Sequence, residues 1–153
     1  MRAHIEARLA AARSDTDPLT RALREVEGPV PQAFIDHLQN QRSPAAVLLG
    51  LVERPEGLAL LFTKRADHLK DHPGQVSFPG GRIEEGDSDP VEAALREARE
   101  EIGLDPQQVS VVGCLERLLT VTGFLVTPVV GFITPGFEPV PDHTEVAEVF
   151  EVP

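Results

Sequence analysis

The sequence predicts an α+β fold in which a mixed β-sheet is covered by at least one helix. Apolar runs rich in Val, Leu and Phe, separated by Gly and Pro, are typical of strands. A single strongly amphipathic stretch in the middle of the chain is typical of a helix that packs on a sheet. The 153 residues, 41% of them apolar, are enough to build the core of one domain.

The first 44 residues are predicted to form a helical segment that packs on the domain. Ile5, Leu9 and Ala12 recur at helical spacing in its first part. The predicted helices cover residues 1–13, 19–26 and 33–38, with breaks at Asp15, Asp17 and Pro18 and at Gly28, Pro29 and Pro31. Whether they cover the sheet or form a dimer contact is left open, and either a monomer or a homodimer is expected.

The remaining residues, 45–153, are predicted to form the main domain. Pro55 and Gly57 separate its first two apolar runs, which indicates paired strands joined by a turn. The predicted strands cover residues 45–52, 58–63, 75–78, 109–121, 126–134 and 145–152, the third being ended by Pro79, Gly80 and Gly81. The last strand stops at Pro153, and we expect a C-terminal segment to be missing from the chain.

The clearest helix is predicted over residues 90–102. Asp89 is a good N-cap residue, and Glu92 completes a capping box. Gly103 is suited to end the helix as a C-cap. The core face of this helix is predicted to carry Val91, Ala94, Leu95, Ala98 and Ile102, with Glu92, Arg96 and Arg99 on the outer side.

The formal net charge is −11, and so acidic a surface repels phosphate backbones, which argues against nucleic acid as a partner. No apolar run reaches the roughly 18 residues needed to cross a bilayer, and the first residues lack the apolar stretch of a signal peptide. The single cysteine, Cys114, has apolar neighbours and is predicted to be a buried core thiol. A cytoplasmic protein with no membrane partner is therefore expected.

Three carboxylates crowd one arc of the predicted helix 90–102, beside its core face. Glu97 lies three and four residues before Glu100 and Glu101, so the three side chains are neighbours and repel one another. Mg²⁺ or Mn²⁺ would relieve this repulsion, because hard cations prefer oxygen ligands. A solvated acidic helix face is the alternative interpretation.

The segment before this helix favours the metal interpretation. Gly80 and Gly81 let the backbone come close to a ligand, and a carbonyl there could give the metal one more oxygen. An acidic loop, residues 84–89, leads from these glycines to the helix. A simple strand-to-helix turn is the alternative.

From Gly81 to Leu104 the sequence resembles the Nudix box, the signature of the Nudix hydrolases. Gly81, Asp87 and the run Arg96-Glu97-x-x-Glu100-Glu101-x-Gly103-Leu104 match it. The usual box has Glu at the position of Asp87, and seven rather than eight residues before the Arg. The resemblance implies a Nudix fold, with a mixed sheet between helices and a catalytic loop and helix.

The residues before the box are similar to the signature of the coenzyme A pyrophosphatase branch. Leu61-Phe62-Thr63-Lys64-Arg65-Ala66, then Lys70, Gly74 and Phe78-Pro79-Gly80-Gly81 match its spacing throughout. Lys70 replaces an Arg of that signature, which keeps the charge but loses bidentate phosphate geometry. A later segment, Thr122-Gly123-Phe124-Leu125-Val126-Thr127-Pro128, also resembles one shared by this branch.

The resemblance implies metal-dependent hydrolysis of coenzyme A, or a derivative, to 4′-phosphopantetheine and adenosine 3′,5′-bisphosphate. The implied metal ligands for Mg²⁺ or Mn²⁺ are Glu97, Glu100, Glu101 and Gly81, and the implied substrate contacts are Arg65, Lys70, Gly80, Gly81 and Phe124. Glu100 or Glu145 would act as the base, while Arg96 would brace the loop.

Each of these roles has a structural alternative in the sequence. Arg65 and Lys70 could be ordinary surface charges, Phe124 a core or turn residue, and Glu145 an edge-strand charge. Two other functions stay open: hydrolysis of another nucleotide diphosphate such as ADP-ribose, and a non-catalytic sensor that binds nucleotides.

Overall fold

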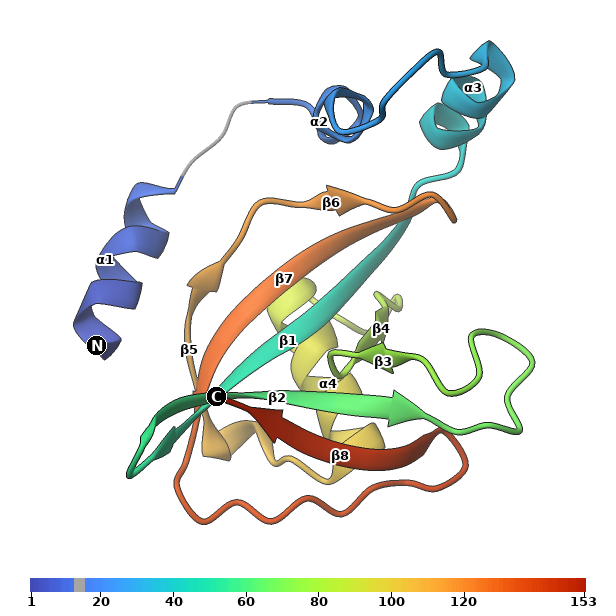
Figure 1. Cartoon of the computed structure of the whole chain (residues 1–153). Coiled ribbons are helices and arrows are strands. Elements are labelled where there is room, and N and C mark those ends of the chain that lie inside the picture. Colours follow the sequence, from blue (N-terminus) through green and yellow to red (C-terminus); the bar gives the residue numbers. More distant parts are fainter. Residues whose placement is uncertain (13–15) are drawn as a thin grey trace.

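The centre of the fold is a pair of long parallel strands, β1 (Ser43–Arg54) and β7 (Phe124–Ile133). A computed structural model describes residues 1–12 and 16–153. The two strands pair in register from Ser43↔Phe124 to Val52↔Ile133. Both are rich in β-branched and Leu residues, which suit strands buried on both faces. Figure 1 shows them crossing the middle of the domain.

The other strands add to this pair in antiparallel fashion. β2 (Gly57–Arg65) follows β1 through a tight turn, and β8 (Val146–Val152) lines the other edge of β2. β5 (Val109–Cys114) and β6 (Leu118–Leu119) pair with β7. Two short strands, β3 (Val76–Ser77) and β4 (Gly80–Arg82), pair with β2 and β1. The mixed sheet predicted from the sequence is confirmed.

One face of the sheet is covered by α4 (Pro90–Ile102), as Figure 1 shows. The helix contributes the fully buried Ala93, Ala94, Ala98 and Ile102 to a core cluster that includes Leu48 and Leu61 of the sheet. Asp89 caps its first turn by accepting a hydrogen bond from the backbone N–H of Glu92, and Gly103 ends it in the left-handed conformation.

Among the described residues before β1 are three helices: α1 (Arg2–Ala11), α2 (Pro18–Arg24) and α3 (Gln32–Asn40). Arg2 of α1 donates to the Ser110 hydroxyl at 2.6 Å, and its guanidinium lies 4.7 Å from the centre of the Phe132 ring. Arg21 of α2 forms an ion pair of 2.8 Å with Glu116, close to β6. These contacts attach α1 and α2 to the β5–β6 side of the sheet. None of the described helices is long and apolar enough to cross a membrane.

Several predicted boundaries need correction. The predicted strand over residues 75–78 is shorter, and the glycines expected to end it belong to β4. The predicted strand over 109–121 is divided into β5 and β6 at residues 115–117, although the backbone N–H of Leu115 still donates to the Pro128 carbonyl oxygen of β7. The end of the first predicted helix at residue 13 and the break at Asp15 lie outside the described residues.

Three side chains also differ from expectation. Glu92 does not complete a capping box with Asp89, because its carboxylate accepts hydrogen bonds from the backbone and hydroxyl of Ser88 instead. Cys114 is half-buried and packs against the core rather than lying within it. Ala93, absent from the predicted core face of the helix, is fully buried.

Candidate active site

Gly80 and Gly81 lie in β4, pressed between β1 and α4. Gly81 pairs with Ala46 of β1. A Cβ atom at Gly80 would lie 2.3 Å from the Ala46 carbonyl oxygen, and one at Gly81 would lie 2.7 Å from the Glu97 carboxylate. Glycine is needed at position 80 because the backbone of β1 lies so close, whereas a side chain at position 81 would displace the carboxylate of Glu97.

Glu97 and Glu101 lie one helical turn apart on the face of α4 that meets β4. The Glu101 side chain is buried, with 8% of the residue exposed, and its Oε2 accepts a hydrogen bond of 3.1 Å from the backbone N–H of Gly80. The Glu97 side chain is 14% exposed. Two largely buried carboxylates are thus held together beside the glycine pair.

Burial makes ionisation of both carboxyls unfavourable. Desolvation, reinforced by the negative charges of Glu97 and Glu145, raises the pKa of Glu101 to about 8, against the opposing effects of the Gly80 N–H and of Arg65. The pKa of Glu97 is raised chiefly by burial, although Arg96 opposes the shift. Buried carboxyls that repel one another are suited to holding a cation.

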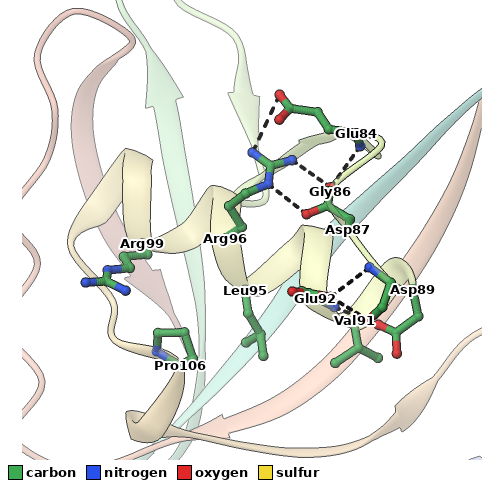
Figure 2. A pocket seen from close by; sticks show the side chains of 11 residues that line it. Glu84, Gly86, Asp87, Asp89, Val91, Glu92, Leu95, Arg96, Arg99 and Pro106 are labelled. Atoms are coloured by element: carbon green, nitrogen blue, oxygen red, sulfur yellow. Dashed lines mark hydrogen bonds and ion pairs between the residues drawn. The ribbon is translucent and has the colours of Figure 1, made fainter.

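Arg96 connects the acidic loop to the helix. Its guanidinium donates two hydrogen bonds to the Asp87 carboxylate, of 2.9 and 3.0 Å, and a third of 3.1 Å to the carbonyl oxygen of Arg82 in β4. Figure 2 shows Asp87 turned toward this guanidinium, with Glu84 on its far side. The bidentate bond lowers the pKa of Asp87 and is a strong, planar contact. Arg96 therefore holds β4, the loop and α4 in one arrangement.

Glu100 differs from the other two glutamates of the run. Its side chain is 59% exposed, and it accepts hydrogen bonds of 3.3 and 3.4 Å from Arg96. The sequence placed Arg96 on the outer side of the helix, away from the three carboxylates. In the structure this residue bonds to Glu97 as well as Glu100 and supplies part of the positive charge that their crowding requires.

The two predicted cationic residues lie at the end of β2 and on the loop after it. The positive charge of Arg65 acts on Glu101, and its Nε donates to the Asp71 carbonyl oxygen at 3.3 Å. Lys70 lies exposed on the loop between β2 and β3. His68 of this loop is 3.0 Å from the Thr144 carbonyl oxygen, which links the loop to the segment before β8.

Glu145, the residue before β8, is exposed, and its negative charge raises the pKa of both Glu97 and Glu101. Its carbonyl oxygen accepts a hydrogen bond of 2.9 Å from the backbone N–H of Ala66. The structure thus brings Glu145, near the end of the chain, close to the helical carboxylates.

Phe124 lies on the face of the sheet opposite to α4 and its carboxylates. It pairs with Ser43 at the start of β7, and the Arg82 guanidinium lies 5.3 Å from the centre of its ring. Sequence reasoning did not select Arg82. Its position directly after the glycine pair was the available signal.

A hollow of about 630 Å³ lies on the outer side of α4, between the helix and the acidic loop. Val91, Leu95 and Pro106 give it apolar walls, and Arg99 points away from the loop at its edge (Figure 2). Glu97 and Glu101 do not line it. The hollow is therefore separate from the carboxylate pair.

The sequence matches the NUDIX domain family over residues 42–151. The chain belongs to the Nudix family. It is 51% identical to NudL, an uncharacterized Nudix hydrolase of Enterobacter sp. (strain 638), over 112 residues that make up 73% of this chain and 58% of that protein. A NudL of Salmonella paratyphi B is 51% identical over 114 residues, 74% of this chain and 58% of that protein. The chain thus spans less than two thirds of the curated relatives that it matches.

Solved Nudix structures confirm the fold. A Nudix hydrolase from M. smegmatis, RenU, superposes with a TM-score of 0.61 and 28% identity over 72% of this chain and 70% of that one. An Ap4A hydrolase from C. elegans gives a TM-score of 0.60 at 20% identity, covering 70% of this chain and 77% of that one. The NUDIX domain of Shewanella oneidensis NrtR, crystallised with ADP ribose, gives 0.55 at 18% identity, covering 88% and 82%.

Nudix hydrolases generally use divalent metal ions, and the side chains present fit such an ion. Glu97 and Glu101 offer hard oxygen donors at a place where burial disfavours the bare carboxylates. Within residues 1–12 and 16–153, no three His, Cys, Asp or Glu side chains are already gathered as a metal-ligand group. Glu100 in particular is directed to Arg96.

Proposed function

We propose that this Nudix protein hydrolyses the diphosphate of coenzyme A or of its derivatives, giving 4′-phosphopantetheine and adenosine 3′,5′-bisphosphate. The observation that carries the hydrolase proposal is the buried pair Glu97 and Glu101, held against the glycines of β4. The coenzyme A proposal rests on the spacing of the segment from Leu61 to Gly81, which resembles that branch.

Glu97 and Glu101 are the proposed ligands of Mg²⁺ or Mn²⁺, with Glu100 and the Gly81 carbonyl as further donors. When bound, such an ion would lower the pKa of a water molecule and neutralise charge on the phosphoryl oxygens. Binding requires ionised carboxylates, so the raised pKa of Glu101 makes metal affinity depend on pH.

The cationic residues are proposed to hold the substrate. Arg65 lies close enough to Glu101 for its charge to affect that carboxyl, so a phosphate bound there would be next to the metal ligands. Lys70, exposed on the loop after β2, would add a second positive charge. In a chain of net charge −11, such local cations are needed to bring phosphate groups near the carboxylates.

Arg96 and two glutamates complete the proposed machinery. Arg96 acts as a brace, since its donors are occupied by Asp87, Glu97 and the Arg82 carbonyl. Glu100 or Glu145 would accept the proton of the attacking water; both are exposed and lie beside the buried pair.

Mutation of the carboxylates tests the hydrolase proposal. Glu97→Gln and Glu101→Gln should each reduce turnover of coenzyme A by at least about 100-fold. The loss of a direct metal ligand should cost more than the loss of a residue that only hydrogen-bonds to such a ligand. Glu85→Gln, at an exposed position of the acidic loop, is the matched control and should keep full turnover. Unchanged turnover in both ligand variants, with intact melting curves, would refute the metal assignment.

A substrate panel separates the proposal from the two alternatives. Cleavage of ADP-ribose but not coenzyme A would keep the hydrolase and remove the coenzyme A assignment. Tight nucleotide binding without cleavage of either compound would indicate a sensor.

A further inference from the structure

We propose that Arg82 binds a third phosphate group of the substrate, the 3′-phosphate at the adenosine end of coenzyme A, and so distinguishes it from 3′-dephospho-coenzyme A. The inference rests on the proposed function and adds a residue that determines specificity.

Arg82 and the carboxylate pair lie on opposite faces of the sheet, although Arg82 directly follows Gly81, which lies against Glu97. Gly81 pairs with Ala46, a core residue facing α4, whereas Arg82 pairs with Ala45 on the other face. Side chains alternate between faces along a strand. An anion held by Arg82 is therefore a different group from a diphosphate held beside Glu97 and Glu101.

The guanidinium of Arg82 is held in place by a neighbouring ring, yet its hydrogen-bond donors can still bind a ligand. It lies 5.3 Å from the centre of the Phe124 ring, and this cation–π contact offers its N–H groups no oxygen acceptor. Its N–H donors lie in the plane and match the oxygens of a phosphate. The backbone is fixed as well, because the Arg82 carbonyl accepts a hydrogen bond from Arg96.

No internal anion competes for these donors within the described part of the chain. There, no carboxylate lies within ion-pair distance of Arg82, and its side chain donates no hydrogen bond. By contrast, Arg54 and Arg96 are paired with acidic side chains. In a protein of net charge −11, an exposed arginine without an acidic partner next to the site is suited to an anionic ligand.

The chemistry of the ligand follows from these two points. A substrate that places its diphosphate at the carboxylate pair needs another anionic group, displaced toward the opposite face of the sheet, to reach Arg82. The 3′-phosphate of coenzyme A is such a group, carrying close to two negative charges at neutral pH. ADP-ribose and 3′-dephospho-coenzyme A lack it.

The test compares KM and kcat for coenzyme A and 3′-dephospho-coenzyme A in wild type and Arg82→Gln. The variant should raise KM for coenzyme A about tenfold, equivalent to about 1.4 kcal/mol, and change KM for the dephosphorylated compound less than twofold, with kcat preserved for both. Arg82→Lys should give an intermediate KM. Arg99→Gln, which removes an exposed arginine on the outer side of α4, should change neither. An equal change for both substrates, or none, would overturn the assignment.

Binding measurements separate failure of this inference from failure of the proposed function. If wild type cleaves neither compound, calorimetry compares adenosine 3′,5′-bisphosphate with adenosine 5′-monophosphate. A preference for the bisphosphate that disappears in Arg82→Gln would support the Arg82 site without hydrolysis. Equal binding of the two nucleotides by wild type would overturn it.

Discussion

Replacing Glu101 with glutamine should change how the stability of the metal-free protein depends on pH. The pKa of this carboxyl is about 8 in the folded protein, against 4.5 as its ordinary value, because the side chain is buried beside other carboxylates. The folded state therefore holds a proton that the unfolded state releases between about pH 4.5 and 8. The free energy of unfolding must fall as pH rises through this window.

The size of the effect follows from the shift. Each pKa unit corresponds to about 1.4 kcal/mol, so full ionisation of Glu101 costs the folded state about 5 kcal/mol. Most of the ionisation in the folded protein occurs near pH 8, and the loss between pH 6 and pH 8 amounts to about 2 kcal/mol. Glutamine cannot ionise, and its amide oxygen can still accept the hydrogen bond from Gly80.

Urea denaturation at several pH values, with a chelator present, measures this loss. The free energy of unfolding of wild type should fall by about 2 kcal/mol from pH 6 to pH 8, and Glu101→Gln should not show this fall. Glu85→Gln should behave as wild type. Added Mg²⁺ or Mn²⁺ should reduce the loss in wild type, because a bound cation favours the ionised carboxylate. Parallel pH profiles for wild type and Glu101→Gln would show that the burial argument is wrong.

Three further predictions follow from the contacts of the site and from the packing of the core beneath it. Gly81→Ala should abolish hydrolysis, because the new methyl group would lie 2.7 Å from the Glu97 carboxylate of α4, and the protein should stay folded. Gly86→Ala, with open space around it, should be fully active in the same assay. Asp87→Asn should lower kcat about tenfold by weakening the brace on the loop, with Glu85→Gln unchanged. Ile102→Ala should lower the free energy of unfolding by about 3 kcal/mol in urea titrations, because the side chain is fully buried; a change below about 1 kcal/mol would contradict the core assignment.

Much of the fold was predictable because local signals and tertiary packing agree. Pro, Gly and capping residues mark both ends of α4, and the apolar runs 45–52 and 126–134 became the central strands β1 and β7. The parallel pairing of these two strands was not predictable, since their partners are distant in sequence. The short strand β4 was missed because its pairing with β1 overrides the low strand propensity of glycine.

The candidate site was predictable in its residue types but not in its contacts. Helical spacing gathered Glu97, Glu100 and Glu101, yet burial separates Glu101 from the exposed Glu100. The bidentate bond between Arg96 and Asp87 depends on the course of the loop. The division at residues 44 and 45, the oligomeric state and the cytoplasmic location remain predictions.

The roles of Glu145 and Arg65 depended even more on tertiary structure. Arg65 ends β2 and Glu145 directly precedes β8. The pairing of these two strands brings both residues to one place, where their charges act on the buried carboxylates of α4. Arg82 shows the converse case. Its neighbour in sequence faces the helix, but strand alternation places its own side chain on the opposite face.

Chromatography of the products formed from coenzyme A, with Mg²⁺ or Mn²⁺ and with a chelator control, tests the central proposal most directly. The proposal predicts that adenosine 3′,5′-bisphosphate and 4′-phosphopantetheine are formed in equal amounts, and only when metal is present. Intact coenzyme A after incubation with either metal, under conditions where the protein is folded, would contradict it.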